Sequence, residues 1–92
     1  MKQISFFVSG VVQGVFYRHY SAKKAKALGL RGFVKNTSEG RVEVVVEGEE
    51  NKVNEFISFC KNNPGYSKVE NIEIKEEREW KTPCFSDFEI RY

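Results

Sequence analysis

The chain has 92 residues, of which 40% are hydrophobic and 30% are charged. That length suits a single domain over residues 1–92 with a modest core, and the composition is typical of a globular protein rather than a disordered chain. No segment approaches the roughly 18 consecutive apolar residues of a membrane-spanning helix. We therefore expect no contact with a membrane.

The net charge of +2 conceals an uneven distribution along the chain. Residues 1–41 carry eight Lys or Arg residues and one acid, whereas residues 42–92 carry seven and twelve. A basic half often marks an anionic partner. The alternative is a solvated lysine face, and charge alone leaves both interpretations open. The lysines concerned are Lys23, Lys24, Lys26 and Lys35.

The first half of the chain predicts a strand, a helix and two further strands. Residues 3–9 alternate apolar and polar side chains, which predicts a strand. Residues 17–28 are rich in Ala, Lys and Leu, which favour a helix that Gly29 would end. Residues 30–36 and 41–48 then predict two strands, and the turn sequence TSEG between them makes the pair a hairpin.

The second half predicts one helix and two strands. Residues 52–62 place apolar side chains at i, i+3, i+4 and i+7, which is the strongest helical pattern in the chain. Asn51 is expected to cap this helix, and Pro64 follows its end. A charged strand is expected within residues 69–79, and a short final strand is expected from residue 88 onwards.

The resulting order is β-α-β-β-α-β with an additional C-terminal strand. Right-handed crossovers in each βαβ half would place both helices on one face of an antiparallel sheet. The sequence therefore predicts an α+β fold, the ferredoxin-like α/β sandwich. Because this fold carries many functions, function has to be inferred from a site.

The segment GVVQGVFYR, residues 10–18, would lie between the first strand and the first helix. The first N–H groups of a helix lack intrahelical partners, and the helix dipole makes that end positive. A glycine-containing turn that leads into it can form an anion cradle, and Gly10 and Gly14 would permit the backbone angles required. Packing is expected to fix the loop through Val12, Val15 and Phe16.

Arg18 would stand at the start of the helix, where a cation opposes the dipole. An anion between the two would resolve this conflict, because a guanidinium can donate two parallel hydrogen bonds to phosphate oxygens. The segment matches neither the GxxxxGK[ST] loop nor GxGxxG, so nucleotide binding gains no support. An ordinary turn with an exposed arginine is the alternative.

Two segments resemble the signatures of one enzyme family. GVVQGVFYR resembles the G-x-V-Q-G-V-x-[FY]-R signature of acylphosphatases. GFVKNTSEGRVEVVVEG, residues 32–48, resembles their second signature, G-[FYW]-[AVC]-[KRQAM]-N-x(3)-G-x-V-x(5)-G, at every specified position. The resemblance continues to the closing FEIRY and covers nearly the whole chain.

The resemblance implies an enzyme that hydrolyses acyl phosphates to a carboxylate and inorganic phosphate. It also implies a cytoplasmic monomer that uses no metal or cofactor. The phosphate-binding arginine of the family falls on Arg18, and its water-positioning asparagine falls on Asn36. Where the family commonly has threonine this chain has Ser21, which keeps the hydroxyl and loses the methyl group. The phosphate-binding loop of the family falls on Val12, Gln13, Gly14, Val15, Phe16, Tyr17 and Arg18.

The chemistry of an acyl phosphate agrees with these residue types. Its leaving group departs readily, so catalysis can depend on positioning and on stabilisation of charge. Arg18 and the loop amides would hold the phosphoryl oxygens, and Asn36 would orient the attacking water. Asn is not a useful base near neutral pH, so we expect a phosphate oxygen of the substrate to accept the proton.

Several conspicuous residues are expected to be structural. His19, the only histidine, follows Arg18 directly and would point away from it on a helix. Cys60 lies on the apolar face of the second helix and is expected in the core, whereas Cys84 is expected in a loop. We expect both thiols to be free, although a disulfide stays open. Packing is the expected role of Phe6, Phe56, Trp80 and Phe88.

Two other classes of protein remain as alternatives. An RNA-binding module of the RRM type shares the order of elements, but RGFV at residues 31–34 follows the first helix directly and lacks the next aromatic of that motif. The acidic second half would also repel a nucleic acid, so none is expected as a partner. A phosphate-binding domain of the same fold without turnover is the second alternative, and Asn36 is the residue that distinguishes it.

Overall fold

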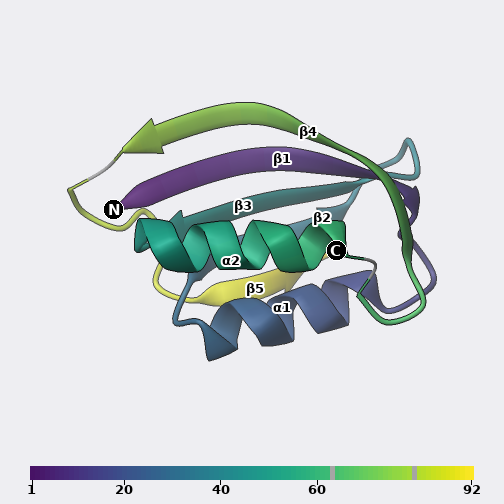
Figure 1. Cartoon of the computed structure of the whole chain (residues 1–92), viewed down its shortest axis with the longest axis horizontal. Helices are drawn as coiled ribbons and strands as arrows, with labels where there is room; N and C mark the ends of the chain where they lie inside the picture. Colours follow the sequence, from purple (N-terminus) through teal and green to yellow (C-terminus); the bar gives the residue numbers. More distant parts are fainter. Residues whose placement is uncertain (63, 80) are drawn as a thin grey trace.

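The computed structural model describes residues 1–62, 64–79 and 81–92. Over these residues it contains two helices and one five-stranded sheet with the strand order β4-β1-β3-β2-β5. Both helices cover the same face of the sheet (Figure 1), so the predicted ferredoxin-like α+β fold is confirmed. In chain order the elements are β1 (Lys2–Val11), α1 (Tyr17–Ala27), β2 (Arg31–Asn36), β3 (Val42–Gly48), α2 (Glu50–Lys61), β4 (Lys68–Glu79) and β5 (Phe88–Arg91).

The directions of the strands determine which strand ends lie together. β1 pairs antiparallel with β3 and β4, and β2 pairs antiparallel with β3. The expected antiparallel sheet is thus present, with one parallel pair between β2 and β5 at its edge. As a consequence β1, β2 and β5 run in the same direction, and their carboxyl ends meet at one end of the sheet (Figure 1).

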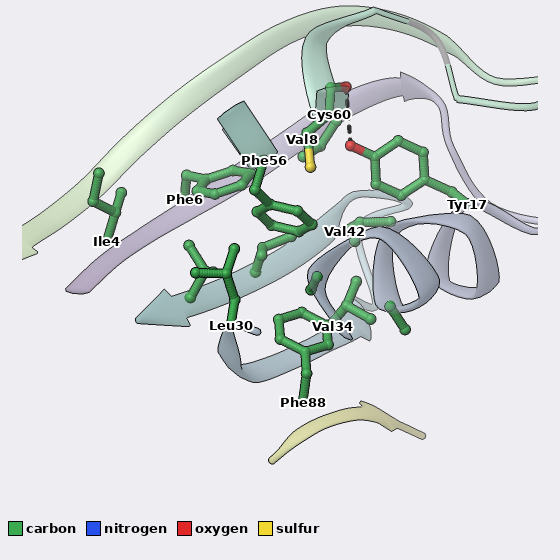
Figure 2. Packing of buried hydrophobic residues seen from close by; sticks show 14 of the residues in the cluster. Ile4, Phe6, Val8, Tyr17, Leu30, Val34, Val42, Phe56, Cys60 and Phe88 are labelled. Carbon is green, nitrogen blue, oxygen red and sulfur yellow. Dashed lines mark hydrogen bonds between the residues drawn. The ribbon is translucent and has the colours of Figure 1, made fainter. Parts of the chain in front are cut away.

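Alternating side chains of the central strands form the core between the sheet and the helices. The apolar residues of β1 and β3 on the helix side are buried, and α2 adds its own apolar face (Figure 2). Phe56 of α2 contacts Phe88 of β5 edge to face, with 5.8 Å between ring centroids. Packing roles for Phe6, Phe56 and Phe88 are confirmed, whereas Trp80 lies outside the described residues. The strand residues involved are Ile4, Phe6, Val8, Val42, Val44 and Val46.

Helix α2 begins earlier than the sequence suggested. Its N-cap is Glu49 rather than Asn51, and the Val53 N–H donates to the Glu49 carbonyl at 2.9 Å. The expectation that Asn51 caps the helix is therefore wrong. In the described structure no side chain caps the start of this helix. Glu50 lies in the first turn instead, where its negative charge complements the helix dipole.

Strand β1 continues past the point where the sequence suggested a loop. Gly10 and Val11 pair with Val69 and Lys68 of β4, after a shift in register between Ser9 and Gly10. Gly10 has φ 123°, and a Cβ there would lie 2.2 Å from the Lys68 carbonyl oxygen. Only glycine fits this close approach. The connection between β1 and α1 is thus shorter than residues 10–18 and starts at residue 12.

Glu47 is a fully buried carboxylate on the sheet face opposite the helices. It accepts hydrogen bonds from the N–H groups of Cys84 at 2.8 Å and Phe85 at 3.2 Å. The Gln3 side-chain amide donates to it at 2.9 Å. A buried carboxylate requires such donors. These bonds hold the segment before β5 against the sheet and so help to place β5 beside β2.

The two cysteines occupy opposite environments. Cys60 is buried on α2, Cys84 is exposed, and within the described residues both thiols are free, as expected. The Tyr17 hydroxyl donates to the Cys60 carbonyl oxygen at 3.1 Å (Figure 2). Burial raises the pKa of the Cys60 thiol to about 12 and also raises the pKa of the Tyr17 phenol. Both groups are therefore neutral at physiological pH.

No helix in the described part of the chain is both long enough and apolar enough to cross a membrane.

We expect a single thiol to react in the native protein. A thiol reagent near neutral pH should modify Cys84 alone, because Cys60 is buried and protonated. Titration with a chromogenic disulfide should give one equivalent for the folded protein and two after denaturation. Cys84→Ser should abolish the native reaction, whereas Cys60→Ala should leave it unchanged. Fast modification of both thiols in the folded protein would contradict the structure.

The free energy of unfolding should fall as the pH rises above 9.0, the ordinary pKa of Cys60. The neutral thiol and phenol are favoured in the fold, so their contribution is complete below the unfolded pKa values and is lost as the pH approaches the raised folded values. Denaturant unfolding at stepwise pH up to about 12 measures this loss. Cys60→Ala should lose less stability over the same range. An identical decline in both proteins would show that Cys60 contributes nothing.

Candidate active site

A cavity of about 460 Å³ opens where β1, β2 and β5 end and α1 begins. Figure 1 shows the connection from β1 to α1 and the C-terminus at this same end of the sheet. β1, β2 and β5 run in the same direction, so their last residues lie at this end of the sheet together with the first turn of α1. The wall consists of Val12, Gly14, Phe16, Tyr17, Arg18, His19, Asn36, Ile90 and Tyr92.

The connection from β1 to α1 is anchored at its start and exposed at its end. Val12 is buried and Val15 packs against the core, as expected. Phe16 is 71% exposed, so the expectation that it fixes the loop by packing is wrong. The chain enters α1 through left-handed backbone, with φ 74° at Gly14 and φ 62° at Phe16. For a residue with a Cβ this conformation costs about 1 kcal/mol.

Helix α1 starts without a side-chain cap and without an acidic residue in its first turn, as far as the described residues extend. The Tyr20 N–H donates to the Phe16 carbonyl at 3.1 Å. The N–H groups of the preceding helical residues therefore have no intrahelical acceptor. Ser21 is fully buried and its hydroxyl donates to the Tyr17 carbonyl at 2.8 Å, which steadies this turn from inside. The helix end is a positive, uncapped site suited to an anion.

Arg18 is held in place by the C-terminal segment. Its Nη1 donates to the Arg91 carbonyl at 3.1 Å, and its guanidinium lies 4.8 Å from the centre of the Tyr92 ring. No ion pair neutralises Arg18 within the described structure. Because a guanidinium has five N–H donors, one bond to Arg91 leaves others for a ligand. Arg18 thus presents an oriented charge at the cavity.

Arg91 and Tyr92 were not singled out from the sequence. The final strand carried a recognisable alternation, but nothing in that pattern indicated which strand it would join. Their proximity to Arg18 depends on the parallel pairing of β5 with β2. The closing FEIRY of the family resemblance was the one signal that could have drawn attention to them.

Asn36 is the last residue of β2 and lines the cavity. Its side-chain oxygen Oδ1 is buried and has no hydrogen-bond partner among the described residues. Leaving a buried acceptor unsatisfied costs about 1–3 kcal/mol. Such a group at a cavity wall is suited to accept a hydrogen bond from a water or a ligand.

Gln13 connects the loop to the hairpin that follows Asn36. Its Nε2 donates to the Thr37 carbonyl at 3.0 Å and to the Arg41 carbonyl at 2.8 Å. The Thr37 hydroxyl in turn accepts the Arg41 N–H at 3.1 Å. Gln13 and Val15 are not among the residues that line the cavity. The Gln13 side chain therefore fixes the loop relative to Asn36.

Tyr17 and His19 also line the cavity, and their side chains have different contacts. The Tyr17 ring is almost fully buried and its hydroxyl bonds to the Cys60 carbonyl, so only its backbone is free to meet a ligand. His19 lines the cavity together with Arg18. Its ring contacts Tyr20 edge to face at 5.4 Å. No cluster of three or more His, Cys, Asp or Glu residues suited to a metal occurs among the described residues.

The two glycines of this segment should respond differently to substitution. Gly14→Ala should destabilise the protein by about 1 kcal/mol, the cost of left-handed backbone, since no described atom lies within 4 Å of the added Cβ. Gly10→Ala should cost substantially more, because its Cβ would overlap the Lys68 carbonyl oxygen. Denaturant unfolding of both variants measures the difference. Equal losses would contradict this description of the end of β1.

Comparison with known proteins identifies the family. The acylphosphatase family model matches residues 4–90. An acylphosphatase from Rubrobacter xylanophilus is 43% identical over 76 residues, which are 83% of this chain and 69% of that protein. One from Syntrophus aciditrophicus is 40% identical over 92 residues, covering 100% of this chain and 94% of that protein. The crystal structure of acylphosphatase from Bacillus subtilis aligns with a TM-score of 0.92 at 37% identity over 100% of both chains. The chain belongs to the acylphosphatase family.

Proposed function

We propose that the chain hydrolyses the carboxyl–phosphate bond of acyl phosphates, with Arg18 and the amides of residues 12–18 holding the phosphoryl group and Asn36 orienting the attacking water. The products are a carboxylate and inorganic phosphate. One observation carries the assignment of the residues: a single cavity is lined by Arg18, by the uncapped start of α1 and by Asn36 with its unpartnered Oδ1.

Binding of the phosphoryl group depends on charge and on direction. The free N–H groups at the start of α1 lie at the cavity, and the helix dipole adds positive potential there. Arg18 supplies a full charge and two parallel donors for phosphate oxygens. Its contacts with Arg91 and Tyr92 orient the guanidinium before the substrate arrives. Such preorganised donors stabilise the charge that develops in the transition state.

The attacking water is positioned by Asn36. Its Oδ1 accepts a hydrogen bond from the water, whose oxygen then attacks phosphorus opposite the acyl oxygen. The bond between phosphorus and that acyl oxygen breaks, and the leaving group departs as a carboxylate that needs no added proton. The water proton passes to a phosphate oxygen of the substrate. This sequence requires no general base from the protein.

We further propose that residues 1–92 act as one catalytic domain, as a monomer in the cytoplasm. The residues that line the cavity come from β2, β5, the start of α1 and the segments next to them, which supports a site formed by one copy of the chain. The reaction as proposed draws its positive charge from Arg18 and the helix end, and needs neither a metal nor an organic cofactor.

Removing either proposed catalytic residue should greatly slow the hydrolysis of acetyl phosphate. Arg18→Gln and Asn36→Ala should each lower kcat/KM by on the order of 10²–10³. Arg18→Gln should also weaken competitive inhibition by inorganic phosphate, whereas Asn36→Ala should lower kcat and leave that inhibition nearly unchanged. A chelator should not alter the rate of the wild type.

Two matched variants control for the chemistry of the substitutions. Arg31→Gln and Asn54→Ala change the same residue types outside the cavity, and both should keep the wild-type rate. Phosphate binding by a folded wild type that never hydrolyses acetyl phosphate would instead support a binding domain without turnover. Full activity of Asn36→Ala would remove Asn36 from the mechanism.

A further inference from the structure

We infer that Glu47 is a positioning residue for Arg18, although it lies at the end of the sheet opposite the cavity. Glu47 pairs with Gln3 and Arg31, near the starts of β1 and β2, whereas the cavity opens where these strands end. The inference rests on the proposed function, because it gives a remote carboxylate the task of orienting the arginine that holds the phosphoryl group.

The Glu47 carboxylate is fully buried, and its oxygens bind a segment that is distant in the chain. Oε2 accepts from the N–H groups of Cys84 at 2.8 Å and Phe85 at 3.2 Å. Oε1 accepts from the Gln3 side chain at 2.9 Å. Burying a carboxylate is unfavourable unless donors of this kind compensate for the lost water. An apolar residue could occupy the same position of β3 without that cost, so burial alone does not explain why a glutamate stands there.

The segment that Glu47 binds, residues 81–87, contains no helix or strand and leads directly into β5. Figure 1 shows it beside the start of β1. β5 has four residues and pairs only with β2 within the described sheet, and at its start the Gly32 N–H donates to the Asp87 carbonyl at 3.0 Å. An edge strand this short has few hydrogen bonds of its own. Its position therefore depends on where the preceding segment is attached, and Glu47 attaches that segment to β3.

A continuous set of contacts leads from Glu47 to Arg18. The Phe85 N–H donates to Glu47, and the centre of the Phe85 ring lies 5.9 Å from the Arg91 guanidinium. The Phe33 ring contacts the same guanidinium, at 4.1 Å, and meets the Phe85 ring edge to face at 5.9 Å. The Arg91 carbonyl in turn accepts from Arg18 Nη1 at 3.1 Å. Loss of the Glu47 contact should therefore loosen the carbonyl that orients Arg18.

Charge and geometry predict opposite effects of removing Glu47. Removing a negative charge would raise the positive potential at the cavity and tighten the binding of an anion. Loosening the Arg91 carbonyl would instead weaken phosphate binding, because Arg18 would no longer be oriented before the ligand arrives. Weaker phosphate binding in a variant without the carboxylate would thus have a geometric cause.

The test measures the inhibition constant of inorganic phosphate and the kinetics of acetyl phosphate hydrolysis in Glu47→Ala and Glu47→Asp. Asp keeps the charge but shortens the side chain by one C–C bond of about 1.5 Å, so it cannot reach both amides. In each variant KM and the inhibition constant should rise about fivefold, the equivalent of one hydrogen bond. The value of kcat should change by less than about twofold, because uniform binding of the phosphoryl group is what weakens.

Glu47→Gln is the conservative variant that should rescue phosphate binding. Its amide oxygen can still accept from the N–H groups of Cys84 and Phe85, and its amide nitrogen can donate to the Gln3 side-chain oxygen after that amide rotates. The inhibition constant of phosphate should therefore stay close to the wild-type value.

Two further variants control for stability and for the type of substitution. Val53→Ala removes a buried apolar side chain of α2, and Glu43→Ala removes a carboxylate from the same face of β3, both outside the cavity wall. Both should keep the wild-type inhibition constant, because this constant does not depend on the fraction of the protein that is folded. A wild-type inhibition constant in Glu47→Asp, with only stability lowered, would leave Glu47 a purely structural role and overturn the inference. Glu47→Asp decides the question even if Glu47→Ala does not fold.

Calorimetry with inorganic phosphate separates this inference from the proposed function. If the wild type binds phosphate without hydrolysing acetyl phosphate, and Glu47→Asp binds phosphate more weakly, the proposed function fails and the positioning role stands. If the wild type hydrolyses acetyl phosphate and Glu47→Asp binds phosphate as tightly, the positioning role is overturned and the proposed function stands. A folded wild type that neither binds phosphate nor hydrolyses acetyl phosphate would refute both.

Discussion

The common direction of β1, β2 and β5 is the constraint on which the rest of the molecule depends. Each of the two crossovers through a helix joins strands that are separated in the sheet by one other strand, which places both helices on the same face. The loop of residues 12–16 follows β1, Asn36 ends β2, and Arg91, whose carbonyl accepts from Arg18, ends β5. Three distant parts of the sequence therefore contribute to one cavity without any long loop.

Rigidity at this cavity comes from contacts made outside it. The Tyr17 side chain reaches into the core and bonds to the end of α2, so the first residue of α1 is fixed by packing (Figure 2). Ser21 ties the same turn together from inside, and Gln13 joins the loop to the hairpin after Asn36. Sites on such supported elements keep their donors in position before a ligand binds, which is the requirement for electrostatic catalysis.

The basic residues of the first half of the chain do not all lie at the cavity. The lysines of α1 lie outside the cavity wall, and Lys24 pairs with Glu55 of α2 at 3.5 Å while it contacts the Phe59 ring. Lys23 and Lys26 are exposed, so this group fits the alternative of a solvated face. The cation that lines the cavity with the uncapped start of α1 is Arg18. Charge alone left an anionic partner and a solvated face open, whereas the structure shows which basic residues line the cavity and which face the solvent.

Some features of this protein could be predicted from local sequence patterns, whereas others depend on tertiary contacts. Alternation and helical periodicity placed every strand and helix to within a few residues, because these patterns reflect which side of an element faces the core. The GVVQGVFYR segment and Asn36 could also be singled out as candidate site residues from the sequence, because glycines, an arginine at a helix start and the family signatures are local features. Tertiary structure decided the rest: Arg91 and Tyr92 beside Arg18, Glu47 buried under Cys84 and Phe85, and Phe16 left exposed. Each of these depends on partners many residues away in the chain, and a sequence pattern records what one element buries but not which distant residue meets it.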